Sequence, residues 1–517
     1  MKWVSEMRGA SAGGNAVFAT AKSPTFLFVL AAVLILGACA TRAAMGHWAS
    51  QPNRDLFQHM AALRSLIADL RNPSNPFVNT HETSRHFNPY WTAMAVLARV
   101  FDWTIATAIG VASFLSLSVL AFGYFLFGRT YFRSEWGPLA LLLCSLLAWS
   151  MPISHTGFVN IPTLVEGAAY PAVLLVGLSL ILWAWIIRAF DCPAYSFGVG
   201  ALCALMFSTH QLGAGLGFIV GTFLISFWPN GTMKRRATLL IAMGVGIAAA
   251  TFWIYYNPVE AVIRAGNPTW SGGVEWYTPK YLLGILIPSA LGIFGLMRPY
   301  VPGTGRPLLL ALPVLVCGFA SGAFGFLTGT RFAPTAALLL QIGLAAMLVR
   351  FLENPEKHGD RFKLALAGTA FGTLLFQAIA LGLILYPIEY RDEQRFGSVL
   401  AAGIVLTDDI PDTREVAAFD VAAWPLVATG QKVLSVPWPE PFISDLSERQ
   451  RKIDRLFDIR ISRAQRVALA KQYGVQTLIL DWRFGAMHRW RRWQLKTLAL
   501  QSIAVRRSGP MFRFDLY

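Results

Sequence analysis

The feature that most constrains this chain is a series of long apolar runs, each close to the length needed to cross a bilayer. A helix needs about 20 consecutive apolar residues to span the hydrocarbon core. About eleven segments meet or approach this length: 24–43, 103–127, 135–153, 167–190, 195–209, 211–229, 236–255, 280–297, 306–323, 331–352 and 363–386. Their number predicts a polytopic α-helical membrane protein and excludes an ordinary soluble globular fold.

The composition and charge agree with a membrane protein. Of the 517 residues, 55% are hydrophobic and 14% are charged, and the 36 Phe and 17 Trp suit a lipid-facing surface with interfacial aromatic belts. The net charge of +16 lies largely in short loops between apolar runs. No basic stripe interleaved with aromatic residues is present, so we expect contacts with membrane lipids and none with nucleic acid.

The distribution of basic residues predicts the orientation. Lys2, Arg8 and Lys22 precede the first apolar run, which places residues 1–23 in the cytoplasm by the positive-inside rule. Every second loop then carries Lys or Arg, namely 129–135, 187–193, 230–236, 297–306 and 350–363. The transmembrane domain is therefore expected to cover residues 24–386, and an odd number of spans leaves the C-terminus outside.

The five cysteines give little evidence of disulfides or zinc binding. Cys39, Cys144, Cys192, Cys203 and Cys317 all lie in or beside apolar runs, and none forms a CxxC pair. The segment "LGAC", which ends at Cys39, is similar to a bacterial lipoprotein cleavage box. A small-residue helix end is the simpler explanation, and lipidation of Cys39 stays open.

Residues 387–517 alternate between short strand-like and helix-like segments, which predicts a small α/β domain outside the membrane. The segments expected to form strands are 402–407, 431–436, 475–480, 501–505 and 511–516. Those expected to form helices are 412–423, 445–457, 462–473 and 486–499.

The first outer loop, residues 44–102, contains two further helical patterns. Over 55–70, Leu56, Met60, Leu63, Ile67 and Leu70 follow one another at steps of three and four. The polar positions Gln58, Ser65 and Asp69 fall on the opposite side, so we expect this helix to lie in the membrane interface. "RNPSNP" ends it, and a second short helix is expected over 89–101.

Asp55 stands at the start of the first of these helices, beside the mouth of any cavity that the spans enclose. Its carboxylate could cap the helix by accepting backbone N–H bonds. The alternative is a general base, because a low-dielectric cavity can tune an acid to accept a proton from a substrate hydroxyl. His59, one turn later, either supports this acid or is an ordinary interfacial histidine.

These features together resemble the GT-C membrane glycosyltransferases. The resemblance rests on Asp55 in "NRDLFQHM", on "SRHFNPY" (84–90), on the apolar hairpin "ALMFSTHQLGAGLGF" (204–218) and on the overall topology. It implies transfer of a sugar from a polyprenyl-phosphate or polyprenyl-pyrophosphate donor to a glycan, lipid or protein acceptor on the outer face, with Asp55 as the base. It also implies a bacterial inner membrane location and a periplasmic C-terminal domain.

One departure from the family pattern bears on cofactors. Many members carry two adjacent acids after the first span, whereas here Arg54 precedes Asp55. A divalent metal at this loop is therefore possible but not favoured, and no cofactor is expected.

A lipid-phosphate donor requires cationic groups at the outer rim of the membrane. The candidates for phosphate binding are Arg85, His86, His210, Lys280 and Arg331. Each could instead be an interfacial anchor, as could Arg264. Glu166 is a second outer acid, which could position the acceptor or cap its helix. Trp270, Trp276 and Tyr277 could stack on sugars or belong to the aromatic belt.

Two other functions remain open. A transporter or flippase for lipid-linked substrates usually places charges near mid-membrane, whereas this chain keeps nearly all ionisable residues at its loops. A non-catalytic assembly protein for surface polysaccharide would use the C-terminal domain, including its basic run 488–496, as a binding module.

Overall fold

The computed structural model describes residues 23–44, 54–149, 157–229, 231–265, 291–324, 327–354, 399–437, 440–482 and 492–517. The side chains of Arg54 and Asp55 lie outside this part, as does Lys280. The aromatic residues of 267–279 and the expected span 363–386 also fall outside the described residues.

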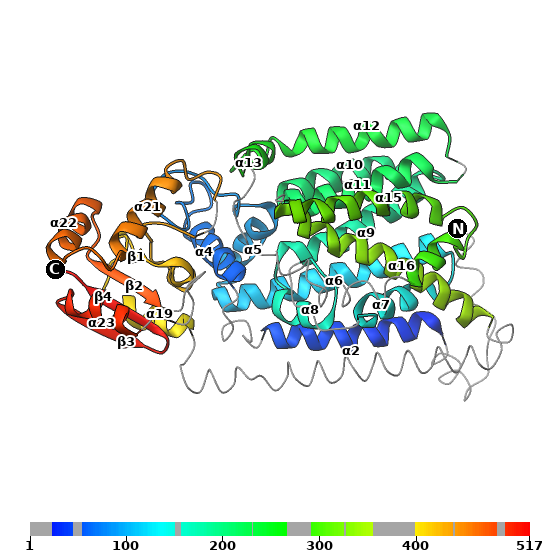
Figure 1. The fold of residues 1–517 in the computed structure, drawn as a ribbon. Helices are drawn as coiled ribbons and strands as arrows, with labels where there is room; N and C mark the ends of the chain where they lie inside the picture. Colours follow the sequence, from blue (N-terminus) through cyan, green and yellow to red (C-terminus); the bar gives the residue numbers. More distant parts are fainter. Residues whose placement is uncertain are drawn as a thin grey trace.

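The main body is a bundle of apolar helices that run back and forth along one axis (Figure 1). It is formed by α2 (Pro24–Ala44), α6 (Ile105–Phe132), α7 (Gly137–Leu147), α9 (Pro171–Ala189), α10 (Tyr195–Thr209), α11 (Gln211–Phe227), α12 (Met233–Ala250), α15 (Gly305–Ser321) and α16 (Phe332–Glu353). Within the described residues, five helices are long and apolar enough to cross a membrane, and the molecule is a membrane protein.

The observed helices follow the expected spans in order along the chain, but several of them are shorter than expected. The five long helices correspond to the expected spans 24–43, 103–127, 167–190, 306–323 and 331–352. Helices α7, α10 and α11 are apolar but only 11, 15 and 17 residues long. The expectation of about eleven spans is therefore only partly supported.

Glycines allow the central helices to pack closely. A Cβ atom on Gly123 of α6 would lie 2.7 Å from the carbonyl oxygen of Gly177 on α9. A Cβ atom on Gly177 would lie 2.8 Å from the backbone nitrogen of Leu120. The two backbones approach so closely that only glycine fits at these positions, as at helix interfaces in other membrane proteins.

The first loop contains α4 (Arg54–Ala68) and α5 (Pro89–Val100), as the sequence predicts. The expected polar face of α4 is wrong, because Gln58 and Ser65 are buried. Ser65 donates a hydrogen bond to the backbone carbonyl of Ser74, so the loop after α4 covers part of this face, and α20 (Ala423–Thr429) from the C-terminal part of the chain also packs on α4. Asn88 caps α5 by accepting a hydrogen bond from the Trp91 amide, 3.1 Å away.

The C-terminal region, residues 399–517, combines helices with a four-stranded sheet. Its helices are α19 (Val399–Thr407), α20, α21 (Leu446–Phe457), α22 (Arg463–Tyr473) and α23 (Arg492–Leu500). Its strands are β1 (Ala417–Ala418), β2 (Thr477–Asp481), β3 (Ala504–Ser508) and β4 (Met511–Asp515), in the order β1-β2-β4-β3. Strand β1 is parallel to β2, and the other neighbours are antiparallel.

Several predicted elements of this region are wrong. Residues 402–407 form helix α19 instead of a strand, and 431–436 contribute only a single bridge, from Val433 to Val416. The expected helix 412–423 is replaced by β1 and a 3-10 turn at Asp420–Ala422. The helices at 445–457 and 462–473 and the strand at 511–516 are confirmed within one residue at each end.

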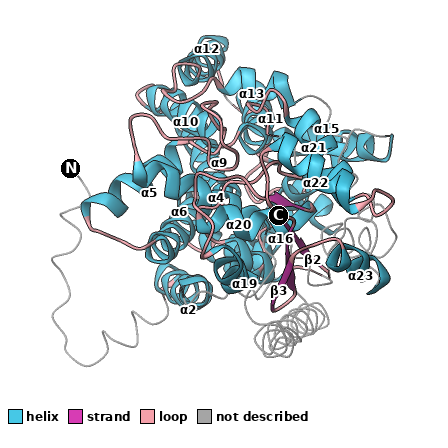
Figure 2. Ribbon diagram, turned by 90° about the vertical axis from the view of Figure 1, so that its left-hand side faces the viewer, coloured by secondary structure: helices cyan, strands magenta, loops and turns pink. Residues whose placement is uncertain are grey.

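The C-terminal region docks on the first loop at one end of the bundle (Figure 1). Figure 2 looks onto this end, where α4 and α20 lie side by side. One hydrophobic core runs continuously from α2 through α4 to α20 and the strand residue Ile479. The start of α2 lies at the opposite end of the bundle from the C-terminal region (Figure 1).

Candidate functional site

A cluster of rings lies where α4, α5 and the start of α9 meet. His59 of α4 stacks on Trp91 of α5 with a ring-centroid distance of 5.2 Å and an interplanar angle of 27°. The edge of His86 meets His59 at 5.2 Å, and Tyr170 lies 5.7 Å from His59. The loop residue His86 and the helix residue His59 are therefore held in direct contact.

Glu440 of the C-terminal region enters this cluster from a part of the chain 355 residues away. Its side chain is 3% exposed, and its Oε1 accepts a hydrogen bond from the Arg85 amide at 3.2 Å. Its Oε2 lies 3.5 Å from Arg85 Nε and 3.5 Å from His86 Nε2. The second distance is in ion-pair range but outside hydrogen-bond geometry, so His86 Nε2 has no hydrogen bond within the described residues.

Burial sets the protonation of this cluster. It lowers the pKa of His59 to about 3, with the nearby His210 and Arg85 adding to the effect. It also lowers the pKa of His86, mainly by desolvation, and it raises that of Glu440 against the opposing charge of Arg85. Both imidazoles are therefore neutral at physiological pH and make weak proton acceptors.

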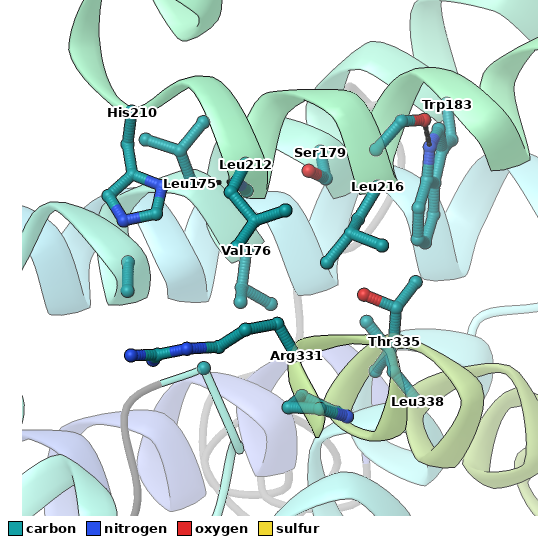
Figure 3. A pocket seen from close by; sticks show the side chains of 15 residues that line it. Leu175, Val176, Ser179, Trp183, His210, Leu212, Leu216, Arg331, Thr335 and Leu338 are labelled. Atoms are coloured by element: carbon teal, nitrogen blue, oxygen red, sulfur yellow. Dashed lines mark hydrogen bonds between the residues drawn. The ribbon is translucent and has the colours of Figure 1, made fainter. Parts of the chain in front are cut away.

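A cavity of about 70 Å³ lies between α9, α11 and α16. Figure 3 shows His210 and Arg331 together at one end and Trp183 at the other. Its walls between these ends are mostly apolar, with Ser179 and Thr335 as the hydroxyl groups. The cavity therefore combines a cationic end with an apolar interior, the arrangement that an amphiphile with an anionic head requires.

His210 is fixed by the break between α10 and α11. Its backbone is extended, with φ −161° and ψ 98°, and its Nδ1 accepts a hydrogen bond from the Gly213 amide at 3.0 Å. This side chain is thus the N-cap of α11. The capping bond occupies Nδ1 as an acceptor, so in the neutral ring the proton is on Nε2, which can donate to a ligand.

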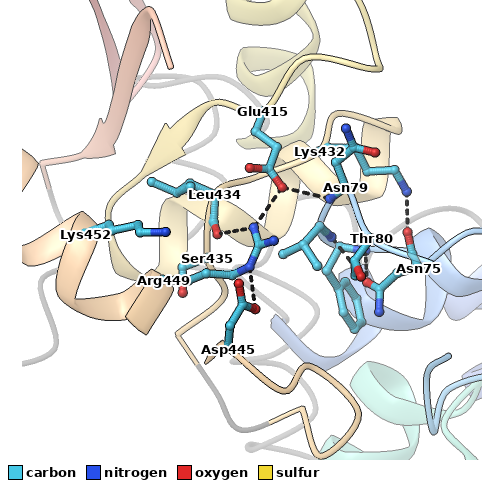
Figure 4. Close-up of polar contacts among 12 residues, drawn as sticks. Asn75, Asn79, Thr80, Glu415, Lys432, Leu434, Ser435, Asp445, Arg449 and Lys452 are labelled. Atoms are coloured by element: carbon cyan, nitrogen blue, oxygen red, sulfur yellow. Dashed lines mark hydrogen bonds and ion pairs between the residues drawn. The ribbon is translucent and has the colours of Figure 1, made fainter. Parts of the chain in front are cut away.

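The contact between the first loop and the C-terminal region is a network of polar bonds (Figure 4). Glu415 Oε1 accepts from the Asn79 amide at 2.8 Å and from Arg449 Nη1 at 2.9 Å. The Lys432 ammonium donates to the backbone carbonyl of Asn75. These bonds hold the loop that carries Arg85 and His86.

The structure brings five of the predicted site residues near one another: His59, Arg85, His86, His210 and Arg331. Asp55 is the second residue of α4, one helical turn before His59. Glu166 is the sixth of the seven residues of α8 (Ile161–Gly167), whose cap is Asn160, so it does not cap the start of a helix. Arg264 lies in α13 (Pro258–Ala265) and pairs with Glu260 at 2.6 Å.

Glu440 is the main site residue that the sequence prediction missed. It stands in "PWPEPF", where prolines and aromatic residues surround a single acid. A single acid among prolines and aromatic residues is the sequence pattern that could have indicated a buried carboxylate. Within the described residues, no group of three His, Cys, Asp or Glu side chains is close enough to hold a metal ion.

Two solved structures have a fold similar to this bundle of apolar helices with its first loop and its docked C-terminal region. Among solved structures, the chain is similar to the arabinofuranosyltransferase AftD from Mycobacteria, with a TM-score of 0.57 and 14% identity. The match covers 94% of this chain and 40% of AftD, so the chain spans well under half the length of that relative.

A second similar structure is the oligosaccharyltransferase of Archaeoglobus fulgidus in its apo form. It has a TM-score of 0.50 and 11% identity, over 87% of this chain and 69% of that chain. No protein-family model matches the sequence, and no curated protein matches it. At these identities the comparisons show a shared fold.

Proposed function

We propose that this protein is an integral membrane glycosyltransferase that takes a sugar from a polyprenyl-phosphate-linked donor. The observation that carries the proposal is the cavity between α9, α11 and α16, where the cationic Arg331 and the neutral N–H donor His210 lie together at one end. The apolar lining matches the chemistry of a prenyl chain, and Arg331 with the His210 N–H matches that of a phosphate. The predicted base, Asp55, is on the same helix as His59, which lies near His210.

The chemistry follows from these groups. Asp55 accepts the proton of an acceptor hydroxyl, and the hydroxyl oxygen then attacks the anomeric carbon of the donor sugar. The bond between that carbon and the phosphate oxygen breaks, and the polyprenyl phosphate leaves with its electron pair. Arg331 and His210 stabilise the charge that develops on the phosphate. Asp55 carries the base role because the depressed pKa of His59 makes its imidazole a poor proton acceptor.

The similar fold of two glycosyltransferases supports an enzyme of this type. The proposed location is a bacterial inner membrane, as the family resemblance implies, and the distribution of basic residues puts the N-terminus in the cytoplasm. The C-terminal region and the site then face the periplasm, where a lipid-linked donor meets a glycan, lipid or protein acceptor.

The test uses purified full-length protein and a panel of undecaprenyl- and decaprenyl-phosphate-linked pentoses and hexoses, with cell-envelope glycan as acceptor. Release of free polyprenyl phosphate is measured for the wild type, Asp55→Asn and Asp69→Asn. Asp69 is the matched control, because it is an exposed acid just after α4 whose carboxylate only accepts the Arg71 and Asn72 amides. An asparagine can keep those bonds.

We expect Asp55→Asn to lower the rate by at least about a hundredfold, the usual contribution of a general base, and Asp69→Asn to change it less than twofold. Wild-type turnover by Asp55→Asn would refute the assignment of the base. If no donor reacts but the protein moves lipid-linked sugar across liposome membranes, the proposal of an enzyme is wrong and the transporter is correct.

A further inference from the structure

A second cavity lies at the end of the bundle opposite the C-terminal region. It has a volume of about 370 Å³ and is lined by Arg129, Thr130, Arg133, Ser134, Glu135 and Arg188. Three guanidinium groups and one carboxylate give its lining a net charge of +2. This cavity shares no residue with the one that contains His210 and Arg331.

The fold holds these arginines in place. Arg188, at the end of α9, donates from Nε to the Thr130 hydroxyl at 3.1 Å and from Nη1 to the Tyr195 hydroxyl at 3.4 Å. Arg129 pairs with Glu135 at 3.2 Å. Within the described part of the chain, the side chain of Arg133 has no hydrogen bond or ion pair and is exposed. The cavity therefore retains uncommitted N–H donors.

The backbone at Arg133 is set by tight packing of the α6–α7 hairpin. A Cβ atom on Gly128 would lie 2.6 Å from the backbone nitrogen of Pro138. To turn this sharply, the chain places Arg133 in the left-handed region, with φ 52° and ψ 33°. This conformation costs a non-glycine residue about 1 kcal/mol. Glycine or asparagine would adopt it more easily, yet the position carries an arginine beside two others.

The cavity lies at the C-terminal end of the longest apolar helix among the described residues. Helix α6 has 28 residues, so it is about 42 Å long, longer than the hydrocarbon core of about 30 Å. Arg129 stands in its last turn and Arg133 is its C-cap, at the end of a helix long enough to reach beyond the hydrocarbon. Basic pockets between helices at this level are suited to anionic head groups.

We propose that this cavity binds a phosphate group, which a lipid head group or a soluble phosphate compound can supply. The guanidinium groups of Arg129 and Arg133 contact the phosphate oxygens, and Arg188 and Thr130 form the back of the site. This site is separate from the donor cavity and does not depend on the proposed glycosyltransferase activity.

The experiment measures binding to purified full-length protein in detergent by native mass spectrometry. One arm titrates phosphatidylglycerol against phosphatidylcholine, and the other titrates inorganic pyrophosphate. The variants are Arg133→Gln and the double variant Arg129→Gln/Arg133→Gln. The matched control is Lys234→Gln, which removes an exposed basic residue near the start of α12, outside the cavity lining. Thermal unfolding confirms that each variant is folded.

For a lipid source, we expect phosphatidylglycerol affinity to fall about fivefold per guanidinium removed, with Lys234→Gln within twofold of the wild type. For a soluble source, pyrophosphate binding falls in the same variants while lipid binding does not. The proposal is overturned if neither ligand distinguishes the Arg133 variants from the Lys234 control.

Discussion

A single buried acid, Glu440, joins the C-terminal region to the loop that carries Arg85 and His86. We predict that Glu440→Ala costs about 2 kcal/mol of folding stability, because the Arg85 amide and the Ser84 hydroxyl lose their acceptor in a buried position. Glu440→Gln should cost less than about 1 kcal/mol. Its amide oxygen keeps the bond to Arg85, and the ion pair contributes little because the Arg85 side chain is 37% exposed.

Hydrogen exchange at the Arg85 amide measures this directly. The Ala variant should exchange about thirtyfold faster than the wild type, which corresponds to about 2 kcal/mol. The Gln variant should exchange at most about fivefold faster. If both variants accelerate exchange equally, the negative charge, and not the acceptor oxygen, holds the junction, and our interpretation is wrong.

Lys432 gives the same junction a dependence on pH. Burial beside the Asn75 carbonyl lowers its pKa to about 8, against an ordinary value of 10.5. Between these values the unfolded chain binds more protons than the folded one, so stability rises as pH increases from about 8 to 10.5 and is lowest below 8. The expected rise is on the order of 1–3 kcal/mol.

Thermal unfolding of wild type and Lys432→Met at pH 7.5, 9 and 10.5 checks this. Other groups titrate in this range, but they do so in both proteins, so the difference between the two isolates Lys432. Methionine keeps the length of the side chain without a charge. The stability of Lys432→Met relative to the wild type should fall as pH rises, and a constant difference would contradict the assigned pKa.

Among the elements, the hairpin of α10 and α11 depends on His210 as a cap and, in our proposal, as a phosphate ligand. The two roles can be separated, because asparagine caps helices well and alanine does not. We predict that His210→Ala lowers stability by about 1 kcal/mol, whereas His210→Asn stays within about 0.5 kcal/mol of the wild type.

Both His210 variants should bind undecaprenyl phosphate at least about tenfold more weakly than the wild type, since each loses a hydrogen bond to a charged group. Native mass spectrometry measures the binding and thermal unfolding measures the cap. If His210→Asn binds undecaprenyl phosphate with wild-type affinity, His210 is only a helix cap and the proposed role as a phosphate ligand is wrong.

Sequence patterns predicted elements well where local signals decide them. Helices α4 and α5 follow from their spacing and from the prolines that bound them. The segment 402–407 failed because a short apolar run fits either a strand or a buried helix. Here its packing on α20 selects the helix. The burial of Gln58 could not be predicted from the local pattern, because the elements that pack on α4 include α20, more than 350 residues further along the chain.

For the molecule as a whole, the candidate site is assembled from distant parts of the sequence. The loop residues Arg85 and His86 could be proposed from local chemistry, and the structure places them together with His59. Glu440 could not, because its importance depends on how the C-terminal region docks. Contacts such as Glu415 with Asn79, 336 residues apart, determine that docking and leave no local pattern.

The orientation of the whole molecule gives the last prediction. Basic side chains gather at the bundle end opposite the C-terminal region, including Arg129, Arg188 and Lys234. By the positive-inside rule this end faces the cytoplasm. Cys192 is exposed at this end, and Ser447 is exposed on α21 of the C-terminal region. A membrane-impermeant maleimide should therefore distinguish the two positions in intact spheroplasts.

Two single-cysteine proteins are compared, one that retains only Cys192 and one with only Ser447→Cys, after replacement of the remaining cysteines by serine. In spheroplasts the Ser447→Cys protein should be labelled and the Cys192 protein should not, whereas lysis should expose both. The reverse pattern would place Arg85, His86 and Glu440 on the cytoplasmic side. The substrates of the site would then have to be cytoplasmic. The C-terminal region supplies Glu440, so the site must lie on the same side of the membrane as that region.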